Sequence, residues 1–196
     1  ALTDVNEKVL AGATEVIRRG LERMAEQGLT EASGIDAAVG RIRTTGDLGD
    51  GTRGADFVVE AVSENLALKQ EIFRRLDALC PPEVVLATNT SVISITEIAR
   101  MATHQERIVG THFWNPPNLI PLVEVVPGER TAPQSVEIAF SLLAALGKHP
   151  VRVKQDVPGF VGNRLQHALW REAVSIVERG IADADVVDEV VKFGFG

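Results

Sequence analysis

Apolar residues recur along this chain in two patterns that alternate. Apolar residues at helical spacing, from Leu10 to Met24, predict an amphipathic helix over about 7–25. Nearly continuous apolar runs then predict strands at 56–62, 84–88, 108–111 and 122–126. Helical spacing between and after these runs predicts helices over about 66–79, 95–101 and 133–146. Alternation of strands with helices is typical of a doubly wound α/β sheet.

The pattern changes after a short predicted strand at 151–153. From Pro158-Gly159 onward only helical spacing remains, and it predicts a long helix over about 160–180 and a second over about 183–192. We therefore expect two units, residues 1–156 as the α/β domain and residues 157–196 as the start of an all-helical C-terminal domain. We expect both units to be incomplete.

The first residues have the character of a strand end with Asp4 at its tip. Dinucleotide-binding folds present a carboxylate to the adenosine ribose in this way. The strand before it and the Gly-rich turn that binds pyrophosphate are expected upstream of Ala1. Residues 46–54 are predicted to be a polar loop, because the glycines from Gly46 to Gly51 depart from the fingerprint spacing. On its own, Asp4 fits a helix N-cap or a surface acid as well as a ribose ligand.

A histidine and a glutamate lie on the two sides of a predicted turn that joins two strands. His112 lies where the strand at 108–111 ends, and Glu124 lies inside the apolar strand at 122–126. A carboxylate there is costly unless it has a partner, and His112 is the obvious one. Such a pair would fix the imidazole tautomer and leave the other ring nitrogen free to take a proton. The alternative is a satisfied core histidine with an unrelated edge glutamate.

Polar residues also follow neighbouring strands of the predicted sheet. Glu64, Ser91 and His112 each lie at or just after the carboxyl end of a strand. In open α/β sheets, ligands bind beyond those ends, so we expect the three side chains to share one edge of the sheet. This convergence predicts a ligand site without any reference to a family.

Composition narrows the classes of protein that this chain can be. The 196 residues are 45% apolar with a formal net charge of -7, and no basic stripe is present, which argues against nucleic acid as a partner. One cysteine, Cys80, fits a reducing compartment. Without a long apolar span we expect no membrane segment, and we expect a soluble, cytoplasmic protein. No set of metal ligands is assigned.

Five short motifs stand in order along the chain: Asn89-Thr90-Ser91, His112-Phe113-Trp114-Asn115-Pro116, Leu122-Val123-Glu124-Val125-Val126, Gly147-Lys148 and Pro158-Gly159-Phe160-Val161-x-Asn163-Arg164. In order and spacing they resemble the L-3-hydroxyacyl-CoA dehydrogenases, among them the 3-hydroxybutyryl-CoA dehydrogenases. The similarity covers nearly the whole chain. It implies a Rossmann-like doubly wound sheet, with the first strand and Gly-rich turn missing, followed by the start of an all-helical domain.

The resemblance implies four catalytic residues and an NAD-dependent oxidation. His112 would remove the proton from the 3-hydroxyl of a 3-hydroxyacyl-CoA, and Glu124 would orient the imidazole and stabilise its charged form. Ser91 would hydrogen-bond the reacting oxygen, and Asn163 would hold substrate or cofactor near the reacting centre. Such donors can stabilise charge on an alkoxide-like oxygen.

The resemblance also implies cofactor contacts. Asp4 would bind the adenosine ribose hydroxyls, and an acid at this position favours NAD over NADP because a carboxylate repels a 2′-phosphate. Glu64, Lys69 and Asn115 would lie with Ser91 on the nicotinamide side. Each has a simpler alternative: Ser91 could cap the next helix, Glu64 and Lys69 could be solvated charges, and Asn115 could be a turn residue. Asn163 could be a helix-surface amide.

The sequence leaves two classes of substrate open, a CoA thioester and a free small hydroxy acid. In the fatty-acid enzymes a serine and a lysine near the first helix touch CoA, and Gly20 and Gln27 stand there in this chain. Pro116-Pro117 is more like relatives that act on free small hydroxy acids, such as carnitine or L-gulonate dehydrogenases. A non-catalytic relative resembling a lens crystallin is the third alternative. The family also implies a homodimer formed through the helical domain.

Overall fold

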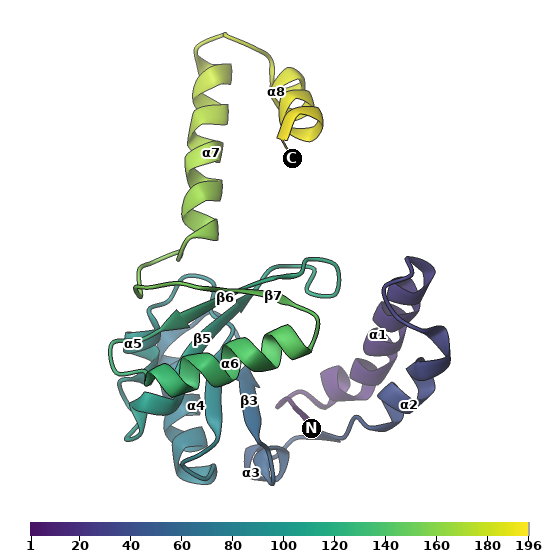
Figure 1. Cartoon of the computed structure of the whole chain (residues 1–196), viewed down its shortest axis with the longest axis vertical. Coiled ribbons are helices and arrows are strands. Elements are labelled where there is room, and N and C mark those ends of the chain that lie inside the picture. Colours follow the sequence, from purple (N-terminus) through teal and green to yellow (C-terminus); the bar gives the residue numbers. More distant parts are fainter. Residues whose placement is uncertain (196) are drawn as a thin grey trace.

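The structure is a computed structural model that describes residues 1–195. Its main sheet contains the strands β3 (Phe57–Glu60), β4 (Val85–Thr88), β5 (Ile108–Phe113), β6 (Leu122–Pro127) and β7 (His149–Arg152). They lie side by side in sequence order, all neighbours parallel except the antiparallel pair β5–β6 (Figure 1). This arrangement is the expected α/β fold.

Helices cover both faces of this sheet. The helices of the chain are α1 (Glu7–Glu26), α2 (Ile35–Gly40), α3 (Leu48–Thr52), α4 (Leu66–Leu79), α5 (Ile95–Ala99), α6 (Pro133–Ala145), α7 (Gly162–Glu178) and α8 (Ala184–Val190). Short 3₁₀ turns occur at Ala32–Gly34 and Gln105–Arg107, and a π-helical turn occurs at Val191–Phe195. Among residues 1–195 no helix is long and apolar enough to cross a membrane.

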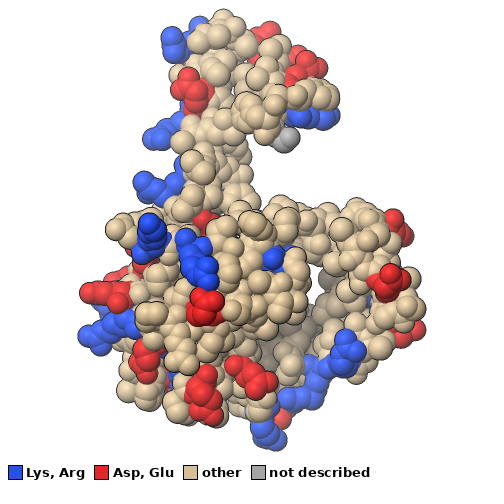
Figure 2. All heavy atoms as spheres, in the orientation of Figure 1, with Lys and Arg blue, Asp and Glu red and all other residues tan. Residues whose placement is uncertain are grey.

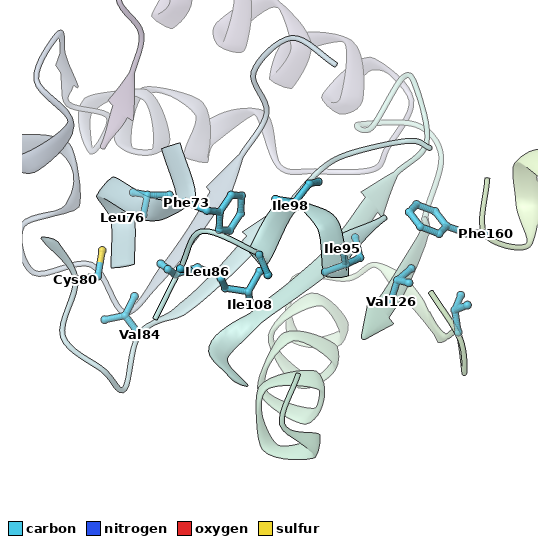
Figure 3. Packing of buried hydrophobic residues seen from close by; sticks show 13 residues of the cluster. Phe73, Leu76, Cys80, Val84, Leu86, Ile95, Ile98, Ile108, Val126 and Phe160 are labelled. Atoms are coloured by element: carbon cyan, nitrogen blue, oxygen red, sulfur yellow. The ribbon is translucent and has the colours of Figure 1, made fainter. Parts of the chain in front are cut away.

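Alternate residues of each strand supply two separate cores. Leu86 and Ile108 face α4 and α5, where they pack with Phe73 and Ile98 in the cluster of Figure 3. Their strand neighbours, such as Val85 and Val109, face α6 on the other side. Because successive side chains of a strand point to opposite faces, continuous apolar runs require a sheet that is covered twice.

The N-terminal segment forms a small unit beside this sheet. Strand β1 (Leu2–Thr3) pairs with β2 (Thr44–Thr45) in parallel and does not join the five-stranded sheet within the described residues. Strand β3 is therefore an edge, and Val59 is 46% exposed, although the apolar run predicted a buried strand.

The prediction of a loop over 46–54 was wrong, because α3 lies within it. Asp47 caps this helix by accepting a hydrogen bond from the backbone N–H of Asp50 at 2.7 Å. Gly49, Gly51 and Gly54 do have the spacing G-x-G-x-x-G. They lie within and after α3 and lead into a strand, so their context differs from the strand–turn–helix of the dinucleotide fingerprint. A Cβ at Gly51 would lie 2.1 Å from Oγ1 of Thr3, so this glycine lets α3 pack on β1.

The buried face of α4 also differs from the predicted apolar stripe. Phe73 and Leu76 are buried as expected, but Leu79 is exposed. Lys69 and Asp77 are buried on this helix instead. Each has an oppositely charged partner, which is the usual condition for burying a charge.

The chain leaves the sheet through a short link that leads into α7. Phe160 is 1% exposed and lies at one end of the core cluster, near Ile95 and Val126 (Figure 3). Asp156 accepts hydrogen bonds from Ser94 and from the backbone at the start of α5, which ties the link to the sheet domain. Beyond this point α7 rises away from the sheet and α8 folds back beside it (Figure 1).

Candidate active site

The antiparallel hairpin of β5 and β6 brings His112 and Glu124 together. The two residues are directly opposite in the register, and their side chains therefore share one face of the sheet. Nδ1 of His112 lies 2.9 Å from Oε2 of Glu124, and both side chains are buried. A buried carboxylate acts as a hydrogen-bond acceptor, so Nδ1 carries the proton and Nε2 is the nitrogen that can accept one.

Glu124 accepts three further hydrogen bonds. Its Oε1 accepts from the backbone N–H groups of Val161 and Gly162, at 2.9 and 3.0 Å, and its Oε2 accepts from the indole N–H of Trp114 at 3.4 Å. Burial raises the pKa of Glu124, but the hydrogen bonds from His112, Gly162, Val161 and Trp114 outweigh it and hold the pKa below its ordinary value. The carboxylate is therefore ionised at neutral pH.

Aromatic rings enclose the imidazole. The ring centroids of Trp114 and Phe160 lie 5.9 and 5.7 Å from that of His112. Phe160 has φ of 49° and follows Gly159 with φ of 76°, so two successive residues adopt the left-handed conformation. This conformation is costly for an aromatic residue, and such strain persists only where the surroundings enforce it. Here it places the ring against His112 and sends the chain into α7.

Gly162 lets the start of α7 approach the hairpin closely. A Cβ at this position would lie 2.2 Å from Cζ2 of Trp114 and 3.0 Å from its Cε2. The indole therefore packs directly on the helix backbone whose N–H groups hold Glu124. The hairpin and the helix form one packed unit around the carboxylate.

A second cluster lies at the carboxyl ends of β3 and β4. Oε1 of Glu64 accepts hydrogen bonds from the hydroxyl of Thr90 and from the backbone N–H of Ser91, the latter at 3.0 Å. Burial raises the pKa of Glu64, but the hydrogen bonds from Thr90 and the backbone of Val92, together with the charge of Lys69, outweigh burial and hold the pKa below its ordinary value. The carboxylate is therefore ionised. The backbone carbonyl of Ser91 accepts a hydrogen bond from the amide of Asn163 at 2.8 Å.

Lys69 lies beneath Glu64 rather than at the surface. Its side chain is 1% exposed, and Nζ lies 2.8 Å from Oε1 of Glu60 and 3.4 Å from Oε2 of Glu64. Glu60 also accepts a hydrogen bond from the hydroxyl of Thr88 at 2.7 Å. The alternative of a solvated charge therefore does not hold for Lys69, which forms a buried ion pair that supports Glu64.

Two predicted cofactor residues lie apart from these clusters. Asp4 accepts a hydrogen bond from the backbone N–H of Asn6 at 2.8 Å, on the separate β1–β2 unit. Asn115 is exposed in the connection between β5 and β6. No hydrogen bond or ion pair within residues 1–195 joins either side chain to Glu64, Ser91 or His112.

Two further simpler alternatives, both for helix caps, do not hold. The side chain that caps α1 belongs to Asn6, and the one that caps α5 belongs to Ser94, so neither Asp4 nor Ser91 serves as a helix cap. Trp114 and Phe160 both occur in the motifs described above, but the sequence alone assigned no role to either. Trp114 stands two residues after His112 in its motif, which was an available signal, whereas Phe160 lies in a separate motif and gave none.

The residues match two models of one family. The model described as "3-hydroxyacyl-CoA dehydrogenase, NAD binding domain" covers residues 1–157, and "3-hydroxyacyl-CoA dehydrogenase, C-terminal domain" covers residues 159–196. The fold is accordingly a Rossmann-like sheet followed by a helical region.

Named relatives of this family act on different compounds. The chain is 45% identical over 91% of its length to a 5-formyl-3-hydroxy-2-methylpyridine 4-carboxylate 5-dehydrogenase of Mesorhizobium japonicum, covering 58% of that protein. It is 35% identical over 94% of its length to the L-carnitine dehydrogenase of Pseudomonas putida, again covering 58%. The crystal structure of 3-hydroxybutyryl-CoA dehydrogenase from Escherichia coli superposes with a TM-score of 0.91 at 36% identity, over the whole of this chain and 41% of that one.

This chain thus spans less than two thirds of the curated relatives named above. The family models nevertheless account for both of its parts, the sheet that carries His112 and the helix that carries Asn163. The chain belongs to the 3-hydroxyacyl-CoA dehydrogenase family, whose N-terminal domain binds NAD.

Proposed function

We propose that this chain carries the reacting centre of an NAD-dependent dehydrogenase that oxidises the 3-hydroxyl of a 3-hydroxyacyl compound. Acyl-CoA is the first candidate for that compound, and a free small hydroxy acid is the second. The observation that carries the proposal is the buried hydrogen bond between His112 and Glu124 at the carboxyl edge of the sheet. The division into residues 1–156 for the cofactor and 157–196 for the helical domain is part of the same proposal.

In this proposal His112 acts as the general base. Its Nδ1–H is held by Glu124, so Nε2 takes the proton of the substrate hydroxyl, and the imidazolium that forms is stabilised by the adjacent carboxylate. A positioned base of this kind typically contributes about 10²- to 10⁴-fold to the rate. Ser91 and Asn163 would supply polar groups to the reacting oxygen, and the hydrogen bond between them holds the start of α7 against the loop after β4.

The residues of the site fit NAD at its two ends. Asp4 provides a half-buried carboxylate at the tip of β1, which suits ribose hydroxyls, and Glu64 provides an ionised one at the tip of β3. Lys69 holds Glu64 in place, Ser91 is exposed in the loop after β4, and Asn115 is exposed in the connection between β5 and β6. Bound NAD supplies the hydride acceptor for the oxidation.

The complete set of polar residues argues against a non-catalytic crystallin-like role. Ser91, His112, Glu124 and Asn163 are all present, and each has a hydrogen bond that orients it or its backbone. The proposal includes a homodimer through the helical domain. Its support is the set of large apolar side chains that are exposed on α7, such as Leu165, Trp170 and Val174.

The test is a kinetic assay of NADH formation with 3-hydroxybutyryl-CoA, L-carnitine and L-gulonate. His112→Gln is expected to lower kcat by at least about 10²-fold while the dissociation constant for NAD stays within about twofold, since His112 acts on the substrate proton. His149→Gln, at an exposed histidine of β7, is the matched control. Equal turnover of the His112→Gln variant and the unchanged protein would remove His112 as the base.

A further inference from the structure

A cavity lies beside the reacting centre, between the sheet domain and α7. Its volume is about 420 Å³, which is in the range of small-molecule sites. The residues that line it come from the loop after β4, from the link and from one side of α7: Val92, Pro158, Gly159, Asn163, Arg164, His167 and Arg171. Since Asn163 is among them, the cavity adjoins the proposed catalytic residues.

The spacing along α7 places two of these side chains beyond Asn163 on the same side. Asn163, His167 and Arg171 follow one another at four-residue steps and so lie on one face of the helix. The amide of Asn163 points to the carbonyl of Ser91, which orients that face toward the sheet domain. At 1.5 Å of rise per residue, His167 and Arg171 lie roughly 6 and 12 Å along the axis from Asn163.

The cavity is strongly biased toward positive charge. Arg164 and Arg171 line it, and no carboxylate is among its lining residues. Within residues 1–195 neither arginine has a carboxylate oxygen within 4.0 Å, whereas Arg107 and Arg152 are both paired. Glu178 lines a neighbouring hollow together with Arg171, farther along α7, and Glu64 accepts a hydrogen bond at 3.2 Å from the backbone N–H of Val92 at the cavity. Figure 2 shows α7 as a stalk with blue side chains along one side and a red one among them near its upper end.

We propose that the basic strip formed by Arg164, His167 and Arg171 binds the carboxylate of a small hydroxy acid, which favours the second of the two candidate substrates, the free acid, over the first, the acyl-CoA. The inference rests on the proposed function and adds the substrate class. Arg171 is the main anchor, because a guanidinium matches the two oxygens of a carboxylate, and His167 and Arg164 add donors. In this role Arg171 binds the substrate away from the reacting carbon.

Distance separates the two possible anions. A phosphate of CoA is separated from its thioester by the whole uncharged pantetheine arm, so it would fall well beyond two turns of α7. The carboxylate of a compact 3-hydroxy acid lies close to the reacting carbon, and the long side chain of Arg171 can reach it because side chains on a helix point back toward its N-terminus, here toward Asn163. The relative at 45% identity that is named for a pyridine carboxylate supports this class of ligand.

The test measures binding separately from turnover. Calorimetric titration of the full chain with acetoacetate and with methyl acetoacetate compares an acid with its uncharged ester. We expect the acid to bind at least tenfold more tightly than the ester. Arg171→Met should reduce this ratio to about twofold or less. Arg179→Met, at an exposed arginine at the end of the same helix outside the cavity, should leave the ratio unchanged.

A kinetic experiment distinguishes a free hydroxy acid from an acyl-CoA as the compound that supplies the anion. With a hydroxy-acid substrate, Arg171→Met should raise KM at least tenfold with kcat within twofold, and Arg171→Lys should recover part of the loss. Equal affinity for acid and ester in the unchanged protein, or a loss in Arg171→Met confined to 3-hydroxybutyryl-CoA, would overturn the assignment. Absence of NADH formation with every substrate, beside a retained preference for the acid, would count against the proposed function alone.

Discussion

The hairpin of β5 and β6 and the body of α7 are adjacent in space but opposite in character. In the hairpin, His112 and Glu124 are buried, and the two carboxylate oxygens accept four hydrogen bonds between them. On α7 no residue is buried, and large apolar side chains such as Trp170 are exposed. The hairpin meets its binding partners within the described chain, whereas α7 presents apolar and basic groups outward.

The contrast indicates where a family can vary. A buried carboxylate that has lost one donor is left with an uncompensated charge, so changes in the hairpin carry a large cost. Substitutions of exposed side chains on a helix usually change the free energy of unfolding very little. We therefore expect the proton chemistry to depend on the hairpin and the choice of substrate to depend on α7.

The largest expected effect is that of Glu124→Gln, which tests whether the hairpin depends on a full negative charge. An amide can accept from one set of donors only, so its NH₂ group would oppose either the indole and imidazole or the backbone N–H groups of Val161 and Gly162. We expect kcat to fall by about 10²-fold and the free energy of unfolding to fall by about 2 kcal/mol. Steady-state kinetics and urea unfolding measure the two.

Glu129→Gln, at a glutamate outside the site, is the control for that experiment and should change neither quantity. Full turnover of Glu124→Gln would mean that orientation of His112 does not require the charge.

Gly162→Ala is expected to have the next largest effect, because it separates the hairpin from the helix. The new methyl would lie 2.2 Å from the indole of Trp114, so the ring or the start of α7 must move. Overpacking of this kind costs about 1–3 kcal/mol in the free energy of unfolding. Chemical denaturation measures it, and adding Trp114→Phe should restore part of the loss because the smaller ring makes room.

Gly12→Ala is the matched control, since a Cβ there meets nothing within 4 Å and alanine favours a helix. Gly162→Ala at undiminished stability would show that the close packing on Trp114 is not needed.

The pH dependence of stability sharpens the comparison further. The pKa of Glu124 lies below its ordinary value of 4.5 in the folded protein, so this group stabilises the fold above that value. The contribution is lost as pH falls from 4.5 through the folded pKa, because the unfolded chain then binds the proton first. Urea midpoints should therefore fall less steeply below pH 4.5 in Glu124→Gln than in the unchanged protein. Parallel curves for the two proteins would contradict the assignment.

The smallest effect is expected on α7. Leu165→Ser removes an apolar side chain that is 66% exposed, so the free energy of unfolding of this chain should change by no more than about 0.5 kcal/mol. Leu86→Ala, at a fully buried position of β4, should cost about 2–5 kcal/mol in the same assay. A large loss from Leu165→Ser would show that α7 has a partner that stabilises it, such as a second copy of the chain.

Local pattern was enough to predict most elements of the sheet domain. The helix over 66–79 and the two strands of the hairpin were predicted within one or two residues, because their apolar spacing matches their period. The short helix α3 was missed because glycines oppose helix formation, and its stability comes from the Asp47 cap, from packing on β1 and from the contact of Leu48 with the core cluster. The exposure of β3 was not predicted, because the residues of a strand do not show whether it has a neighbouring strand on one side or on both.

By itself the sequence determined the α/β alternation and predicted a strand, turn and strand in which His112 is the obvious partner of Glu124. Each depends on side-chain periodicity or on the cost of an unpaired carboxylate, both of which are local properties. Only the tertiary structure decided that Lys69 is buried under Glu64, that the start of α7 supplies two donors to Glu124, and that Arg171 faces the cavity beside Asn163. These facts depend on how distant segments pack, because hydrogen bonds and charges act through space and not along the chain.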